Sequence, residues 1–187
     1  MRIFIVLGHP DRESFNAALA NAYEAAARAA GHEVRRQDIG ALRFDPVLRQ
    51  GYKDLPSLEP DLAEAQANLL WCERLVLIYP MWWGGFPALL KGWLDRVLTP
   101  GFAFLYHKKG SGWDRHLSGR EAHVISTSDC PALYARLWYR NADFTMLARA
   151  ILGFCGIRVT RRLRIGRVKF LNTAARDKAI RRMRALV

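Results

Sequence analysis

Two adjacent tryptophans, Trp82 and Trp83, stand beside two glycines where an apolar run meets an apolar helical stretch. Their indoles offer a flat apolar wall, and Gly84 and Gly85 let the backbone approach a ligand closely. Aromatic side chains at the end of a strand commonly line a ligand site, whereas packing in the core would explain either indole alone. The pair therefore predicts a binding surface for a planar molecule.

A second candidate site lies at residues 8–16, where the first apolar run passes into a helical stretch. Free amide N–H groups and the helix dipole favour a phosphate at such a junction. His9, Ser14 and Asn16 add side-chain donors, although a simple helix cap at Ser14 and a loop histidine at position 9 would explain the same residues. The segment has neither a GxGxxG motif nor a Walker lysine, which disfavours an ordinary Rossmann dinucleotide and a nucleoside triphosphate.

The elements that must position these loops alternate along the chain. Strands are expected at residues 2–7, 33–38, 75–79, 122–126 and 157–165, and helices at 15–30, 60–73, 87–98, 134–154 and 173–186. This order predicts an α/β fold with one domain over residues 1–187, a doubly wound five-stranded parallel sheet with helices on both faces. Ligands bind such folds at the carboxyl ends of the strands, where the loops 8–16, 80–86 and 127–133 fall. The longer connections 44–59 and 99–119 are expected to be functional or to form an interface.

Composition narrows the class of protein. The 187 residues are 51% hydrophobic and carry a net charge of +12, with basic residues concentrated in the segment 158–184. That segment lacks interleaved aromatics and known DNA-binding spacings, so a solvated basic face is favoured over a nucleic-acid site, and steering of an anionic cofactor is a third use. Three scattered cysteines predict neither a disulfide framework nor a metal site. No run has the length of a signal peptide or a membrane span, so a cytoplasmic protein is expected.

Several motifs in order resemble one family. They are residues 5–10 followed by Ser14-Phe15-Asn16, the loop 79–83, the stretch 87–97, and Gly101-Phe102-Ala103-Phe104. Together they resemble the DT-diaphorase-like NAD(P)H:quinone oxidoreductases, which are flavoproteins with a flavodoxin-like fold. The resemblance covers residues 1 to about 157. It implies bound FAD, with FMN possible, NAD(P)H as electron donor, a quinone or similar acceptor used in a ping-pong reaction, and a homodimer with active sites at the interface.

The resemblance also implies roles for particular residues. Flavin phosphates would be bound by His9, Ser14, Phe15 and Asn16, and the isoalloxazine by Pro80, Met81, Trp82, Trp83, Gly84, Ser126, Thr127, Ser128 and Asp129. Phe104 and Tyr106 would close the substrate pocket of the partner subunit. Tyr134 and Arg140 are the catalytic candidates, because negative charge on the reduced flavin needs a nearby donor or cation. The chain departs from the Thr-Thr-Gly-Gly of many members at residues 126–129, where Asp129 introduces a carboxylate.

An alternative function comes from relatives of another kind. Some accompany bacterial potassium-efflux systems as flavin-bearing regulatory subunits. In that case Arg161, Arg162 and Arg164 would belong to a basic face that docks the partner. Binding of nucleic acid is a more distant third function.

Overall fold

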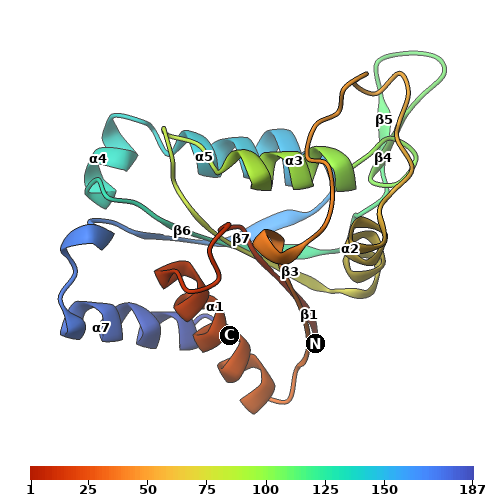
Figure 1. Cartoon of the computed structure of the whole chain (residues 1–187). Helices are drawn as coiled ribbons and strands as arrows, with labels where there is room; N and C mark the ends of the chain where they lie inside the picture. The colour runs from red at the N-terminus through yellow and green to blue at the C-terminus, as the bar shows by residue number, and fades with distance from the viewer.

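A five-stranded parallel sheet forms the middle layer of the computed structural model, which describes residues 1–187 (Figure 1). Its strands are β1 (Arg2–Leu7), β2 (Glu33–Asp38), β3 (Arg74–Pro80), β6 (Glu121–Thr127) and β7 (Arg158–Ile165). They pair in the order β2-β1-β3-β6-β7, and every pair is parallel. The predicted doubly wound α/β fold is therefore confirmed. The direction of winding reverses between β1 and β3, which is where such folds open a crevice for a ligand.

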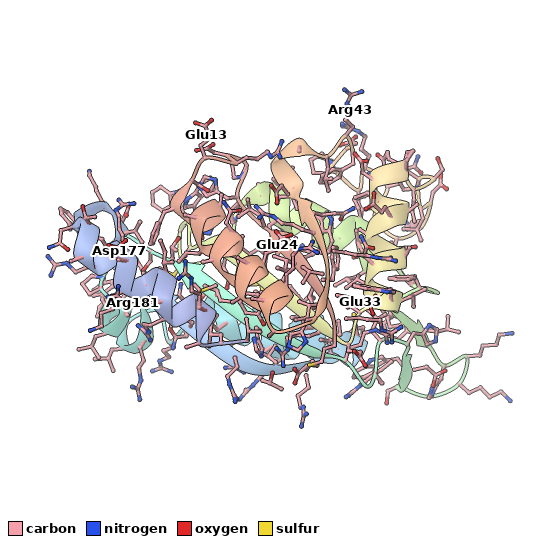
Figure 2. All side chains as sticks on the ribbon, turned by 90° about the horizontal axis from the view of Figure 1, so that it is seen from below. Glu13, Glu24, Glu33, Arg43, Asp177 and Arg181 are labelled. Carbon is pink, nitrogen blue, oxygen red and sulfur yellow. The ribbon has the colours of Figure 1, made fainter.

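Helices cover both faces of the sheet (Figure 1). One face carries α1 (Phe15–Ala29) and α7 (Thr173–Arg184), and the other carries α2 (Pro60–Trp71), α3 (Ala88–Val97) and the segment from α5 (Ala142–Thr145) to α6 (Leu152–Cys155). Figure 2 shows α7 beside α1, with Asp177 and Arg181 labelled on α7 and Glu24 on α1. This arrangement brings the C-terminal helix next to the first one.

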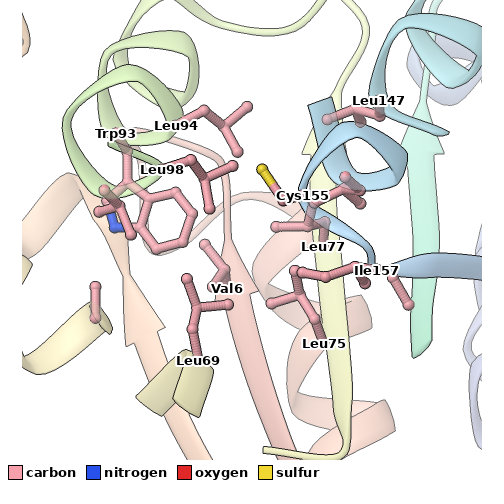
Figure 3. Close-up of a cluster of buried hydrophobic side chains, with 14 of the residues drawn as sticks. Val6, Leu69, Leu75, Leu77, Trp93, Leu94, Leu98, Leu147, Cys155 and Ile157 are labelled. Carbon is pink, nitrogen blue, oxygen red and sulfur yellow. The ribbon is translucent and has the colours of Figure 1, made fainter. Parts of the chain in front are cut away.

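Alternating side chains of the strands build two cores. Ile3, Ile5 and Leu7 of β1 pack toward α1 and α7, whereas Phe4 and Val6 pack toward the opposite helices. Figure 3 shows part of the second core, in which side chains from the sheet, α2, α3 and α6 meet. Since successive strand residues point to opposite faces, strands that are apolar throughout are covered on both sides. The carboxyl ends of the strands, which carry the ligand loops, are thereby held between two packed layers.

Local signals set most helix ends. The Ser14 hydroxyl accepts a hydrogen bond of 3.3 Å from the Ala17 amide and so caps α1. Gly31 follows that helix with φ +79°, and Pro60 occupies the first turn of α2, where no amide hydrogen is needed. Pro87 immediately precedes α3, which begins one residue later than expected.

The helix expected over residues 134–154 is wrong as a single element. The structure has α4 (Ala132–Leu137), a turn, α5, the π-helical segment η2 (Met146–Ile151) and α6. Arg140 and Asn141 lie in the turn with φ of 50° and 48°. Two successive left-handed residues cannot continue a right-handed helix, so the polypeptide changes direction there.

The connection 99–119 contains a small hairpin, which the strand pattern of the sequence does not predict. Its strands β4 (Phe104–Tyr106) and β5 (Trp113–Arg115) pair antiparallel. The Trp113 ring stacks on Phe154 at 4.5 Å between centroids, and its Nε1–H donates to the Phe154 carbonyl at 2.8 Å. Two single-turn elements, η1 (Ile39–Ala41) and η3 (Val168–Phe170), complete the chain. None of the helices combines the length and apolar character that crossing a bilayer demands.

Candidate functional site

A pocket of about 210 Å³ opens at the carboxyl ends of β1, β3 and β6. It brings together ten of the residues predicted to bind a cofactor. These are His9, Ser14, Phe15, Asn16, Pro80, Met81, Trp82, Thr127, Ser128 and Asp129. Val168 of η3 also lines the pocket, and no local sequence signal pointed to it. The three loops therefore meet at one place, as parallel strands require.

The first loop presents hydrogen-bond donors to this pocket. The amides of Phe15 and Asn16 precede the first intrahelical bond of α1, which Ala18 donates to Ser14. The Asp11 amide donates to Nδ1 of His9 at 2.9 Å, so the neutral imidazole carries its proton on Nε2. Burial lowers the pKa of His9, and its interactions with Asp11 oppose this shift. His9 can thus act as a neutral N–H donor beside the helix N-terminus.

The tryptophan loop is a tight turn. Trp82 and Gly85 exchange two backbone hydrogen bonds of 3.1 and 2.9 Å, and the central residues Trp83 and Gly84 both have positive φ, 52° and 75°. Positive φ at both central positions is the pattern of a type I′ turn, and it is strained for a tryptophan. Neither central amide donates to another backbone group. The Trp82 ring meets His9 edge-on at 5.8 Å, so the first two loops are in contact.

Hydrogen bonds connect the third loop, residues 127–133, to the start of α1 and to the end of β7 and the segment that follows it. The Asn16 amide side chain donates to Oγ1 of Thr127 at 3.0 Å, and the Ser128 amide donates to the Ile165 carbonyl at 2.9 Å. One oxygen of Asp129 accepts the Lys169 amide at 3.2 Å. The backbone N–H groups of Asp129 and Cys130 donate to no other backbone group. Of the two residues, Asp129 lines the pocket, so its amide remains available to an anionic group there.

A buried network of four polar side chains lies directly behind the pocket. Asp143 accepts hydrogen bonds from the Tyr79 hydroxyl at 2.9 Å and from Nη2 of Arg164 at 2.5 Å. Arg164 also donates to the Ser126 hydroxyl at 2.9 Å, and its guanidinium lies 4.3 Å from the centre of the Phe144 ring. Burial, followed by the Asp143 carboxylate, raises the pKa of Tyr79 well above its usual value. Tyr79 therefore acts as a neutral donor.

This network positions two of the site loops, because Tyr79 precedes Pro80 and Ser126 precedes Thr127. Sequence reasoning assigned Ser126 to the flavin, but its side chain is fully buried and does not line the pocket. The same reasoning missed Asp143. A buried partner 21 residues from Arg164 along the chain leaves no local pattern to find.

Arg164 also requires a correction to the predicted basic face. Its side chain is 6% exposed and its charge is paired, so it cannot dock a partner together with Arg161 and Arg162. The side chains of Arg161 and Arg162 are exposed. The regulatory alternative thus loses one of its three named residues.

The remaining predicted residues lie outside the pocket lining. Trp83 is fully exposed at the tip of its turn, and Gly84 approaches Tyr139. Tyr134 stacks against Trp138 on the surface of α4, and Arg140 lies in the turn that follows.

Phe104 and Tyr106 lie at a second site in this chain. They line a separate apolar pocket of about 320 Å³ with side chains from α3, η2 and α6. A single chain therefore does not bring them to the first pocket.

A larger polar groove of about 980 Å³ adjoins the first loop near β2. Arg36 there is paired with both Asp38 and Glu24, and Arg12 also contacts Asp38. The groove has no aromatic wall. The smaller pocket, with its indole and its free amides, is the better candidate for chemistry.

Comparisons with known proteins agree with this geometry. A family model described as "Flavodoxin-like fold" matches residues 1–187. The NAD(P)H dehydrogenase [quinone] 1 of Cavia porcellus is 32% identical over 186 residues, covering 84% of this chain and 66% of its own length. The chain spans about half to two thirds of the length of such curated relatives.

Solved structures share the architecture. Smu.1420 from Streptococcus mutans is 29% identical, with a TM-score of 0.83 over 100% of this chain and 98% of that one. The NAD(P)H:quinone oxidoreductase of Methanothermobacter marburgensis, at 24% identity, shows the same fold, with a TM-score of 0.82 over 99% of this chain and 93% of that chain. With its strand order and its three converging loops, the chain belongs to the flavodoxin-like fold family.

Proposed function

We propose that this protein is a flavin-dependent NAD(P)H:quinone oxidoreductase. The net reaction converts NAD(P)H, a proton and a quinone, or a similar small acceptor, into NAD(P)⁺ and the hydroquinone. The observation that carries the proposal is the pocket at the carboxyl ends of β1, β3 and β6, where an aromatic wall meets a helix N-terminus. A curated relative named for this reaction supports it.

The donor set of the pocket fits a flavin. The amides of Phe15 and Asn16 and the Nε2–H of His9 suit a phosphate at the N-terminus of α1. Trp82 supplies an apolar wall, and the free amides of the turn after it suit the carbonyl edge of a ring. FAD is the cofactor that the sequence motifs imply. FMN, which a Bacillus anthracis azoreductase of the same fold binds, is the alternative.

When bound, a flavin accepts a hydride from the nicotinamide and passes it to the acceptor. The protein contributes position and electrostatics. The free amide of Asp129, which lines the pocket, is proposed to stabilise negative charge there. Tyr134 and Arg140, on the segment that follows, are the side chains proposed to assist it. NAD(P)H and the quinone take turns in the same space in a ping-pong order.

A homodimer completes the proposed site. Exposed apolar side chains gather on α4 and the tryptophan turn: Trp82, Trp83, Leu133, Leu137, Trp138 and Tyr139. Contiguous apolar surface of this kind commonly marks an interface. Docking of a second copy there would bring its Phe104 and Tyr106 to the pocket, where they close it over the substrate.

An anaerobic absorbance titration tests the proposal. The purified protein is saturated with FAD, or with FMN in a parallel sample, and then receives NADPH or NADH followed by a small benzoquinone. We expect the flavin band near ~450 nm to bleach with the nicotinamide and to recover with the quinone. Failure to bind either flavin would refute the site, and bound flavin that neither nicotinamide reduces would refute the reaction.

Two variants test the residue roles. Tyr134→Phe and Arg140→Ala should slow one or both half-reactions in stopped-flow measurements. Leu70→Ala, an exposed position on α2, is the control and should leave both rates unchanged. Unaltered half-reactions in both site variants would remove the role given to these side chains.

A further inference from the structure

Positive charge is distributed unevenly along this chain. Residues 121–187 contain 14 of the 29 basic residues but only 4 of the 17 acidic ones. Three of these four carboxylates are engaged: Glu121 with Arg74, Asp143 with Arg164, and Asp129 with the Lys169 amide. The fourth, Asp177, lies on α7. The basic side chains of this segment therefore have almost no internal counterions.

Four unpaired arginines, three of them from this segment, line one pocket of about 340 Å³ beside β7. They are Arg115, Arg149, Arg158 and Arg162, and no carboxylate lines the pocket with them. None of the four forms an ion pair or a side-chain hydrogen bond within the chain. They come from β5, η2 and β7, so the tertiary fold rather than a local run of sequence brings them together.

Two features of the backbone shape this pocket. The π-helical segment η2 supplies Ala148 and Arg149, and Gly153 follows it, where a Cβ would lie 2.4 Å from the Ala148 carbonyl oxygen. Single turns of π-helix inside helices are frequently found at functional sites. Small residues at these positions leave the hollow open toward the arginines.

One guanidinium is held in place before any ligand arrives. Arg115 lies over the Trp113 ring, 5.2 Å from its centroid, and Trp113 is itself fixed by stacking and a hydrogen bond to Phe154. A planar guanidinium loses less freedom per hydrogen bond than a lysine ammonium, and its fork matches phosphate oxygens. This is a favourable starting point for recognition of an anion.

We propose that the four-arginine pocket binds a soluble ligand that carries a chain of two or more phosphates. Four converging cations without a counterion match the linked charges of a diphosphate or triphosphate better than a single carboxylate or sulfate. The pocket is distant from the proposed flavin site. The two pockets share no lining residue. Arg158 begins β7, and Ile165, whose carbonyl accepts the Ser128 amide, ends it roughly 20 Å away at the usual rise per strand residue.

Isothermal titration calorimetry with inorganic tripolyphosphate tests this proposal on the full chain at 150 mM NaCl. Saturating FAD is present throughout, so that the phosphate site at α1 is filled. We expect Arg149→Gln/Arg162→Gln to weaken binding by about tenfold or more, since each lost guanidinium removes charge-assisted bonds. The matched control is Arg181→Gln/Arg182→Gln, which removes the same charge from exposed positions on α7 across the sheet. It should change affinity by less than about twofold, because salt screens charges beyond a Debye length.

Parallel titrations separate the sources of the phosphate chain. Equal affinity for ATP and tripolyphosphate would assign recognition to the phosphates alone, and tighter binding of ATP would assign part of it to the nucleoside; both support the pocket. Undetectable binding of tripolyphosphate and ATP would overturn it. Equal losses in the two double variants would also overturn it, as would tighter binding of a short single-stranded RNA that both variants weaken alike, because the surface would then act only through its overall charge. Thermal melts should match wild type, since all the substituted side chains are exposed.

Discussion

The buried pair of Asp143 and Arg164 yields a sharp prediction about stability. Asp143 is inaccessible to solvent and Arg164 is 6% exposed, so Asp143→Asn preserves the shape of the side chain but leaves a guanidinium charge buried without a partner. Removing one member of such a pair typically costs about 3–5 kcal/mol in the free energy of unfolding. We expect a loss of that size, which is a large share of the stability of an ordinary domain.

Urea unfolding, followed by far-UV circular dichroism, measures this loss. Asp95→Asn is the control, because Asp95 forms a half-exposed i,i+4 pair with Lys91 on α3 and should change the free energy by less than about 1 kcal/mol. The double variant Asp143→Leu/Arg164→Met should recover most of the loss, because no charge then remains buried.

Binding of flavin reports on the same network. Tyr79 and Ser126 lead into two site loops, so Asp143→Asn should also weaken FAD binding in fluorescence titrations, whereas the control should not. The reasoning is refuted if Asp143→Asn and Asp95→Asn lower stability equally. It is also refuted if Asp143→Leu/Arg164→Met is less stable than Asp143→Asn.

Three further predictions concern separate parts of the molecule. A Cβ at Gly40 would lie 1.9 Å from the Pro10 carbonyl oxygen, so Gly40→Ala should shift the first loop and lower FAD affinity in a fluorescence titration; unchanged affinity would contradict this. Trp138 is 73% exposed on the proposed dimer face, and Trp138→Glu should convert dimers to monomers in sedimentation velocity, whereas Leu70→Glu on α2 should not; a monomeric wild type would end this prediction. Burial, aided by Arg74, lowers the pKa of His123 from 6.5 to about 4. Between these two pKa values the unfolded chain binds a proton that the folded chain does not. The contribution of His123 to the free energy of unfolding is therefore complete above pH 6.5 and falls by about 2–3 kcal/mol between pH 7 and pH 4.5. Urea unfolding at both pH values should show a smaller acid loss for His123→Gln, and an equal loss would exclude the histidine as its source.

The sequence predicted the five sheet strands well. β1, β3 and β6 are short apolar runs, and the more polar β2 and β7 follow from the alternation of strand and helix along the chain. The sequence also placed three loops at the same end of the sheet, because the carboxyl ends of parallel strands all lie at that end. The continuous helix over residues 134–154 failed for a physical reason. Neither glycine nor proline marks the break, and the left-handed backbone at Arg140 and Asn141 is set by tertiary packing that single-sequence periodicity cannot register.

The site was predictable only where residues lie on the loops themselves. His9 and Trp82 lie two residues beyond β1 and β3, and Thr127 ends β6, so their place follows from the fold. Asp143 and Val168 reach the site region from distant segments, and only the three-dimensional path of the chain brings them there. Tyr106, which we propose that a partner subunit contributes, lines a separate pocket within its own chain.

The two edges of the sheet have a consequence for the behaviour of the protein in a crowded solution. An edge strand presents unpaired N–H and C=O groups that can recruit a strand from another molecule. Here β7 carries Arg158, Arg161 and Arg162, none of which forms an ion pair, whereas the two arginines of β2 are balanced by Glu33 and Asp38. Two copies that approached through β7 would set rows of guanidinium groups against each other. Repulsion at this edge should therefore keep β7 from pairing with β7 of a second copy while leaving the ligand-binding end of the sheet open.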